Sequence, residues 1–172
     1  MSTIRYCYME SPFGQLLIAG REGKLHSIGL PPEGGARLPG SLWKLDPAPF
    51  REAVRQIDAY FSRRLRDFDL ALAPEGTHFQ KKVWTALREI PYGDTVSYAE
   101  IARRIGHARA VRAVGAANGA NPLPIVIPCH RVIGSEGRLT GYGGGVHVKQ
   151  ALLVLEGLAC DESGCVLPRP IA

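Results

Sequence analysis

Three short stretches at the start of the chain, 4–9, 15–19 and 24–30, are rich in apolar residues. Turn-forming clusters rich in Gly, Pro and Ser separate them, so the pattern predicts a small antiparallel sheet. Apolar residues then recur at helical spacing at Phe50, Val54, Ile57, Phe61 and Leu65. This periodicity predicts a helix that covers one face of the sheet, and residues 65–73 are a candidate for one more strand.

The second half of the chain has the pattern of helices joined by tight turns. One apolar stripe, formed by Phe79, Val83, Leu87 and Ile90, predicts a helix that stops before residues 91–93. Ser97 and Glu100 have capping-box spacing and predict a short helix that ends at Gly106. A second helix over 109–118 follows after about three residues, which is the layout of a helix-turn-helix.

Together these elements predict an α+β protein of two domains. Residues 1–77 form a small sheet with one helix and a linker, and residues 78–172 form a mostly helical domain. The last predicted helix carries Val148, Ala151, Leu152 and Leu155 and ends at Glu156, with Gly157 as its C-terminal cap.

The second helix of the predicted helix-turn-helix has two distinct faces. Val111 and Val114 supply an apolar anchor, while Arg109, Arg112, Ala113 and Ala116 fall on another stripe. Small side chains allow a helix to lie close to DNA, and arginines reach phosphates or bases. The alternative is that the alanines only favour helix formation and that the arginines are solvated.

Charge is distributed unevenly along the chain. Residues 1–77 carry 10 Lys and Arg against 9 Asp and Glu, whereas residues 78–157 carry 10 against 5. The excess of positive charge therefore belongs to the helical half, where it favours contact with a phosphate backbone.

The 172 residues, of which 45% are hydrophobic, suffice for a packed core. No apolar run is long enough to span a membrane, and the first residues lack the pattern of a signal peptide, so a cytoplasmic protein without a membrane partner is expected. The four cysteines, Cys7, Cys129, Cys160 and Cys165, form no CxxC pair and are expected to be free thiols.

Cys129 is the candidate nucleophile, because it lies between Pro128 and His130 at the end of an apolar run. An adjacent imidazole or a positively charged setting favours a reactive thiolate. Glu156 is a carboxylate able to orient His130, which would complete a Cys-His-Glu arrangement. The alternative is a buried cysteine that acts only as a small apolar residue.

Several motifs, taken together, resemble the O6-alkylguanine-DNA alkyltransferase family. They are Val96-Ser97-Tyr98, Arg112-Ala113-Val114-Gly115, Asn121-Pro122, Pro128-Cys129-His130-Arg131-Val132-Ile133 and Thr140-Gly141-Tyr142-Gly143-Gly144-Gly145. Their order and spacing match the family over roughly 79–157, and residues 11–14 resemble its N-terminal domain, which is ribonuclease H-like.

The resemblance implies direct repair of DNA that contains O6-alkylguanine, with O4-methylthymine left open as a second substrate. The alkyl group moves to Cys129 without any cofactor, and each molecule acts once. The protein is expected to work as a monomer on double-stranded DNA, with cooperative binding left open.

The resemblance also assigns roles to single residues. Cys129 is the nucleophile, His130 the base acting through water, Glu156 the residue that orients His130, Asn121 a support of the active-site turn, and Tyr98 a hydrogen-bond donor to the departing guanine. Arg112 enters the duplex in place of the flipped nucleotide, with Ala113, Arg109 and Tyr98 also at the DNA. Val132, Tyr142 and Gly143 line the base pocket.

Two departures from the family limit what carries over. Some members bind zinc in the N-terminal domain, but Arg21 stands where a ligand would be expected and His26 alone fits, so no metal is expected. Gly143 begins a run of three glycines where other members have a serine or bulkier residues, which leaves the range of alkyl groups open.

Two other classes of function compete with this interpretation. An alkyltransferase-like protein binds alkylated bases without repairing them, but such proteins replace the reactive cysteine. A cysteine hydrolase could use Cys129, His130 and Glu156, but it would have no need for a helix-turn-helix.

Overall fold

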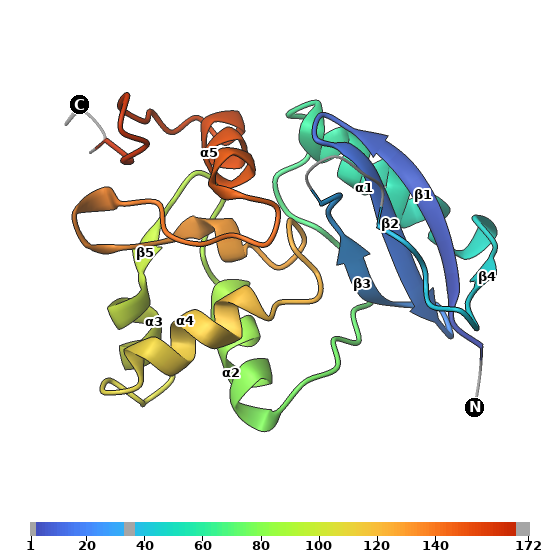
Figure 1. The fold of residues 1–172 in the computed structure, drawn as a ribbon, viewed down its shortest axis with the longest axis horizontal. Helices are drawn as coiled ribbons and strands as arrows, with labels where there is room; N and C mark the ends of the chain where they lie inside the picture. Colours follow the sequence, from blue (N-terminus) through green and yellow to red (C-terminus); the bar gives the residue numbers. More distant parts are fainter. Residues whose placement is uncertain (1–2, 33–36, 168–172) are drawn as a thin grey trace. The chain divides into compact units, whose positions relative to one another are not determined.

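The computed structural model describes residues 3–32 and 37–167. The chain divides into two compact units. The N-terminal unit comprises Met1–Glu75 together with Pro122–Val126, and the C-terminal unit comprises Gly76–Asn121 together with Ile127–Ala172. A small sheet with a helix in the first unit and a set of helices in the second confirm the predicted α+β class (Figure 1).

The N-terminal unit is built on three antiparallel strands that agree with the prediction: β1 (Arg5–Ser11), β2 (Gly14–Arg21) and β3 (Lys24–Gly29). A two-residue strand that the pattern did not predict, β4 (Lys44–Leu45), pairs in parallel with β1. The strand order is therefore β3-β2-β1-β4. Two residues are too few for a period-2 pattern to reveal a strand.

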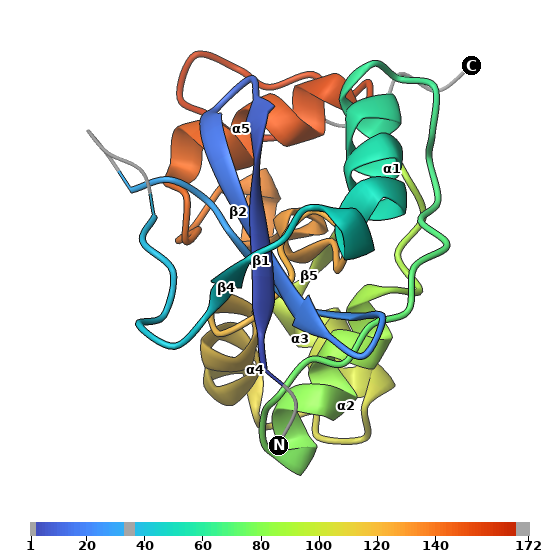
Figure 2. The same ribbon diagram turned by 90° about the vertical axis from the view of Figure 1, so that its right-hand side faces the viewer.

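Helix α1 (Arg51–Phe61) follows a 3-10 turn, η1 (Ala48–Phe50), and lies along one face of the sheet (Figures 1 and 2). Its buried residues are Ala53, Gln56, Ile57, Ala59 and Tyr60. The helix ends before Leu65, which the periodicity had included, because Arg63 has a φ of 58° and so leaves the helical region.

Residues 65–73 form no strand of their own, contrary to the prediction. They make one parallel bridge, between Leu25 and Leu72. The buried side chain of Gln56 binds the backbone of Asp69 through both its oxygen and its nitrogen, each at 2.9 Å. These bonds satisfy backbone groups that a ladder would otherwise pair.

The segment Pro122–Val126 packs with the N-terminal unit although it lies far along the chain. The amide of Ile28 donates a hydrogen bond of 2.8 Å to the carbonyl of Pro122. Within the segment, Ile125 is fully buried and has a φ of 75°. This backbone conformation is costly for a β-branched residue, so the strain must be offset by the packing around it.

The C-terminal unit contains four helices and one short parallel ladder among the described residues. The helices are α2 (His78–Leu87), α3 (Tyr98–Arg104), α4 (Val111–Gly119) and α5 (Val146–Leu155). The ladder joins β5 (Val96–Ser97) to β6 (Val132–Ile133). Helices α2, α3 and α4 pack against one another, and the indole of Trp84 donates a 2.8 Å hydrogen bond to the carbonyl of Ala117.

Helices α3 and α4 form the predicted helix-turn-helix, with Gly106 at a φ of 76° in the turn. The hydroxyl of Ser97 accepts from the amide of Glu100 at 3.1 Å, so Ser97 is the N-cap, as predicted. Glu100 does not complete the capping box, because its carboxylate binds Arg103 and Arg104 instead. A glutamate with two arginines one turn away gains more from them than from one backbone amide.

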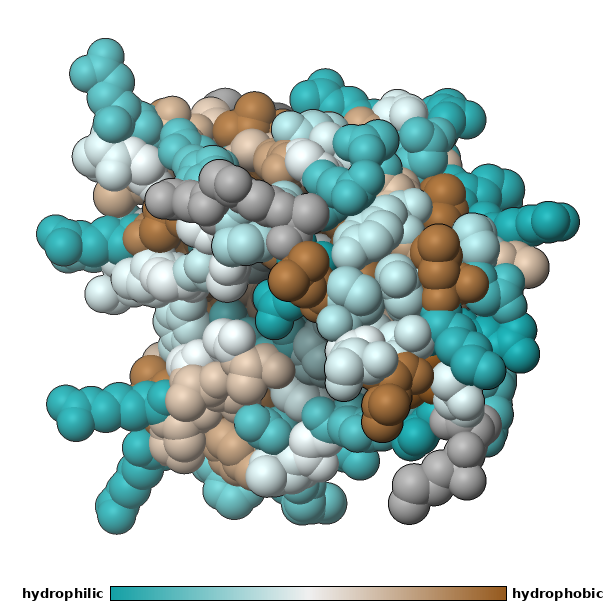
Figure 3. All heavy atoms as spheres, turned by 45° about the vertical axis from the view of Figure 1, so that its right-hand side comes forward, coloured by the Kyte–Doolittle hydropathy of each residue, from teal (hydrophilic) through white to brown (hydrophobic). Residues whose placement is uncertain are grey.

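The surface of the described residues carries no continuous apolar face in the view of Figure 3, where apolar and hydrophilic groups alternate. Leu38, Leu42 and Leu45 are individually exposed in the N-terminal unit. None of the helices in the described ranges has the length and apolar character needed to cross a membrane.

The start of α2 gives a test of the fold. Thr77 accepts from the amide of Gln80, and the side chain of Gln80 binds the amide of Thr77 in return. We expect Thr77→Ala to lower the free energy of unfolding by about 1 kcal/mol, because the amide of Gln80 loses its side-chain acceptor and the capping box is broken. Thr77→Ser, which keeps the hydroxyl, should stay close to the parent in a urea titration. Equal losses in the two variants would contradict a role for the cap.

Candidate functional site

Cys129 begins a single 3-10 turn, η2 (Cys129–Arg131), which leads directly into β6. Two asparagine side chains at the end of α4 and just after it bind the backbone around this turn. Asn121 donates from Nδ2 to the carbonyl of Ile127 at 2.8 Å, and Asn118 donates from Nδ2 to the carbonyl of Cys129 at 3.3 Å. Asn121 was predicted to support this turn, whereas Asn118 was missed because a lone asparagine near a helix end has no distinctive spacing.

The thiol of Cys129 is only 4% exposed. Burial raises its pKa, because a thiolate would lose its hydration. Hydrogen bonds from Asn121 and Tyr142 and the charge of Lys149 act in the opposite direction, but burial outweighs them. The resting residue is therefore a thiol, and a base has to take its proton before the sulfur becomes a strong nucleophile.

His130 and Glu156 lie in direct contact, as predicted. Nε2 of the fully buried His130 is 2.8 Å from Oε1 of Glu156. An ionised carboxylate only accepts hydrogen bonds, so the proton of the neutral ring belongs on Nε2. Nδ1 is then the atom of His130 that accepts a proton. Burial, together with the charges of Arg131 and Lys149, lowers the pKa of His130 despite the contact with Glu156.

Glu156 occupies the C-cap of α5, where the helix dipole disfavours a negative charge. Arg131 offsets this: its Nε and Nη2 each donate at 2.9 Å, one to each carboxylate oxygen. The backbone amide of Gly93 donates to Oε2 at 3.0 Å. Burial alone would raise the pKa of Glu156, but His130 and Arg131 hold it well below its usual range.

Lys149 is a site residue that sequence reasoning missed. It is fully buried on α5, and its Nζ donates to the carbonyl of Thr140 at 3.1 Å and to the hydroxyl of Tyr98 at 3.5 Å. Among the described residues no carboxylate pairs with it, and burial lowers its pKa to about 8. The available signal was its place on the apolar side of a predicted helix, next to Val148 and Leu152.

Tyr98 begins α3, and its hydroxyl also lies 3.2 Å from the hydroxyl of Thr140. Burial raises the pKa of Tyr98, with a further contribution from the negative charge that Cys129 can carry. Because electrostatic influence between Tyr98, Lys149 and Cys129 requires short distances, the phenol, the ammonium and the sulfur share one buried environment. The phenol is accordingly protonated and able to donate a hydrogen bond.

The predicted base pocket is only partly assembled by the structure. Val132, three residues after Cys129, is fully buried, and Tyr142 lies close enough to hydrogen-bond with the sulfur. Gly143 is exposed, and a Cβ added there would meet nothing within 4 Å. Packing therefore does not require glycine at 143, so any need for it must come from what occupies the loop.

The face of α4 predicted to contact DNA is open to solvent. Arg109, Arg112, Ala113 and Ala116 are all exposed. Two details differ from the prediction: α4 begins at Val111, which leaves Arg109 in the turn, and Val111 is itself 37% exposed. Val114 anchors the helix, as expected, but its second anchor is Ala117, one turn further on.

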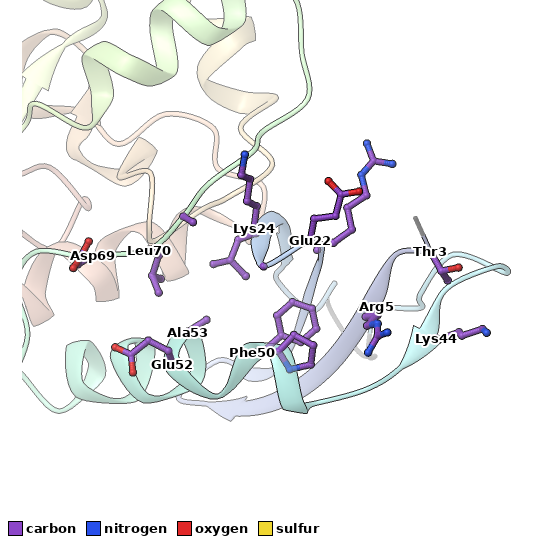
Figure 4. A pocket seen from close by; sticks show the side chains of 16 residues that line it. Thr3, Arg5, Glu22, Lys24, Lys44, Phe50, Glu52, Ala53, Asp69 and Leu70 are labelled. Atoms are coloured by element: carbon purple, nitrogen blue, oxygen red, sulfur yellow. The ribbon is translucent and has the colours of Figure 1, made fainter. Parts of the chain in front are cut away.

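The other cysteines and one cavity of the N-terminal unit include none of the candidate site residues. Cys7, Cys160 and Cys165 are free thiols, as expected. A cavity of about 580 Å³ is lined only by the N-terminal unit, including Phe50, Leu70 and Lys24 (Figure 4). It contains none of the candidate site residues. In the described ranges, no cluster of three or more His, Cys, Asp or Glu side chains could hold a metal ion.

Comparison with known proteins shows the family of the chain. Residues 4–74 match the family described as 6-O-methylguanine DNA methyltransferase, ribonuclease-like domain. Residues 78–158 match its DNA binding domain. The chain belongs to the 6-O-methylguanine DNA methyltransferase family. The resemblance inferred from the motifs around Cys129 is thereby confirmed.

Individual members of the 6-O-methylguanine DNA methyltransferase family are similar over almost the whole chain. A methylated-DNA--protein-cysteine methyltransferase of Methanosarcina barkeri is 55% identical over 152 residues, covering 88% of this chain and 96% of the relative. The crystal structure of the Mycobacterium tuberculosis O6-methylguanine methyltransferase has a TM-score of 0.83 at 49% identity, covering 90% and 93%. A structure of the same organism's protein in complex with DNA has a TM-score of 0.82 at 49% identity, covering 88% and 92%.

Lys149 gives a test of this site by stability. A buried ammonium without a carboxylate partner costs free energy, so Lys149→Met, which keeps the shape but not the charge, should melt at the same temperature as the parent or higher. Leu152→Ala on the same helix should lower the free energy of unfolding by about 2–5 kcal/mol, because it leaves a cavity. A melting temperature of Lys149→Met well below the parent's would contradict the unpaired burial of this charge.

Proposed function

We propose that this protein repairs DNA by moving the alkyl group of O6-alkylguanine onto its own Cys129. The observation that carries the proposal is the buried thiol of Cys129 beside a His130–Glu156 pair, in a chain of the 6-O-methylguanine DNA methyltransferase family. The names of its relatives, methylated-DNA--protein-cysteine methyltransferase, support the same reaction. O4-alkylthymine is left as a second candidate substrate.

The chemistry follows from the two nitrogens of His130. Because Nε2 of His130 keeps its proton in the hydrogen bond to Glu156, Nδ1 is the nitrogen that takes the proton of the Cys129 thiol, through one water. The sulfur electron pair then forms a bond to the alkyl carbon, and the bond from that carbon to O6 breaks with its electrons on the guanine. The product is a thioether, so no step regenerates the thiol and each molecule reacts once.

Tyr98 and Lys149 stabilise the guanine as it leaves. Negative charge develops on the base when the bond to O6 breaks, and a hydrogen bond from the Tyr98 hydroxyl offsets it. The buried ammonium of Lys149, 3.5 Å from that hydroxyl, lowers the free-energy cost of the negative charge that develops on the base next to the Tyr98 hydroxyl. On this basis Lys149→Met should also slow alkyl transfer although it leaves the fold intact.

DNA is the partner that the exposed face of α4 fits. An O6-alkyl group inside stacked DNA cannot reach a thiol that is 4% exposed, so the nucleotide must leave the helix. In this proposal Arg112 fills the space of that nucleotide and Ala113 allows close approach, which the exposure of both residues on α4 supports. The DNA complex of the Mycobacterium tuberculosis neighbour supports this partner.

Two further parts of the proposal concern the protein in the cell. We expect a monomer that binds double-stranded DNA, with cooperative binding left open. We also expect a cytoplasmic location, which the free thiols of all four cysteines support, since they are typical of a reducing compartment. No cofactor is required by the reaction as written.

A single experiment separates this proposal from its rivals. We expect incubation with duplex DNA containing O6-methylguanine to add one methyl group to the protein, seen by intact mass, and Cys129→Ala to abolish the addition. Cys160→Ala is the matched control and should react like the parent. Repeated turnover would indicate a hydrolase, and binding without transfer would indicate an alkyltransferase-like protein.

Arg112 gives a test of base flipping. We expect Arg112→Ala to slow transfer from duplex DNA by at least about tenfold, because the vacated stack is no longer filled. Transfer from the free base O6-benzylguanine should change little, since Arg112 is exposed and the base needs no flipping. Arg64→Ala, which removes an exposed arginine of the N-terminal unit, serves as control. Equal slowing on both substrates would contradict the role in flipping.

A further inference from the structure

Arg131 is a buried arginine whose guanidinium contacts groups inside the protein and is not exposed for contact with DNA. It is 5% exposed, and all three of its guanidinium nitrogens are engaged. Nε and Nη2 bind the two oxygens of Glu156, and Nη1 donates to the carbonyl of Ile90 at 2.6 Å. Its Cζ lies 5.8 Å from the ring centroid of Tyr92. Arg131 thus joins the active-site turn to α5 and to the residues that follow α2.

The contacts of Arg131 and His130 converge on the same oxygen. Oε1 of Glu156 accepts from Nε2 of His130 at 2.8 Å and from Nη2 of Arg131 at 2.9 Å. A carboxylate alone with a buried histidine favours the imidazolium, because the two opposite charges attract. Because the guanidinium of Arg131 already binds both oxygens and neutralises the charge of Glu156, the carboxylate stabilises an imidazolium at His130 much less.

Four charged or titratable groups act on His130. Glu156 is negative, Arg131 and Lys149 are positive, and Cys129 is neutral as a thiol. Adding a proton to His130 would raise the charge of this buried cluster from +1 to +2, counting those four side chains. Removing the thiol proton instead would bring it to zero, so these charges disfavour a resting imidazolium and offset part of the cost of burying a thiolate.

From this geometry we propose that Arg131 is a positioning residue that sets the charge of His130. By binding both oxygens of Glu156, it keeps His130 neutral, with the proton on Nε2 and Nδ1 as the acceptor. The inference rests on the proposed function, in which His130 is the base, and goes beyond it by naming the residue that keeps this base ready at neutral pH.

Lysine could not take this place. Only a guanidinium presents two parallel donors to a carboxylate and a third to a carbonyl on the opposite side. Arg131→Lys keeps the positive charge but loses the two-point contact, whereas Arg131→Met removes the charge and keeps most of the apolar volume. The two variants therefore separate charge from geometry.

The test is the pH dependence of single-turnover methyl transfer to Cys129, followed by intact mass on the full chain. We expect the rate of the parent to fall on the acid side at the pH where His130 becomes protonated. In Arg131→Met this fall should move up by about one pH unit or more, because Glu156 then acts on His130 alone. The rate should recover at higher pH, and Arg131→Lys should show a smaller shift.

A purely structural role gives a different result. If Arg131 only held the fold together, its variants would lower the reactive fraction of the protein and leave the midpoint of the acid fall where the parent has it. That result would overturn the proposal. Arg55→Met, which breaks an exposed arginine–glutamate pair on α1, is the matched control and should leave both the rate and the midpoint unchanged.

A measurement on the parent protein covers the case in which the variants do not fold. The ¹⁵N chemical shifts of the imidazole distinguish its tautomers and its cation. We expect His130 to be neutral at pH 7 with the proton on Nε2, and an imidazolium at pH 7 would overturn the proposal. This measurement needs no alkyl transfer, so an absence of transfer in the parent would refute the proposed function while leaving the charge of His130 decided by the spectrum.

Discussion

The carboxylate of Glu156 is the group on which the C-terminal unit depends. It is buried at the end of α5, an unfavourable place for a negative charge, and it is stabilised by His130, by Arg131 and by the amide of Gly93. His130 and Arg131 belong to the active-site turn η2, whereas Gly93 lies in the segment that follows α2. A buried carboxylate has to be fully hydrogen-bonded to be tolerated, so its satisfaction fixes the positions of the active-site turn, α5 and the residues after α2 together.

The site as a whole carries excess positive charge around a neutral thiol. Arg131 pairs with the carboxylate of Glu156, whereas Lys149 donates to a carbonyl and has no anionic partner in the described part of the chain. This arrangement costs stability in the resting protein. The same charges become favourable when the sulfur loses its proton and when the base departs, because both events place negative charge nearby. The resting protein therefore loses stability because its charges are organised to stabilise the transition state.

Sequence patterns predicted the elements that obey a regular period and missed those fixed by single contacts. Helices α2 and α5 were predicted because their apolar positions repeat, α3 from its cap and its terminal glycine, and strands β1 to β3 from turn clusters that bound them. The end of α1 and the course of residues 65–73 were not, since they depend on Arg63 leaving the helical region and on Gln56 binding Asp69. Those contacts arise only in three dimensions.

The candidate site divides in the same way. Cys129, His130 and Glu156 were found because each has a chemical type that invites a role, and the structure brings the last two together at 2.8 Å. Arg131 and Lys149 were overlooked as functional residues, since a basic residue in a sequence is usually solvated. These two side chains are candidates for a functional role because they are buried, and the repeat of apolar positions in a sequence does not readily reveal the burial of a long charged side chain.

The use of each molecule once follows from the same geometry. In a cysteine hydrolase the imidazolium returns its proton to a leaving group, and water then frees the sulfur. In the proposed reaction the proton of Cys129 leaves before a carbon–sulfur single bond forms, and a thioether is neither polarised nor a good leaving group. Protonation of the departed guanine would restore the neutral His130 but would not free the sulfur. The base that starts the reaction cannot finish a cycle, so the acceptor cysteine is consumed along with the lesion.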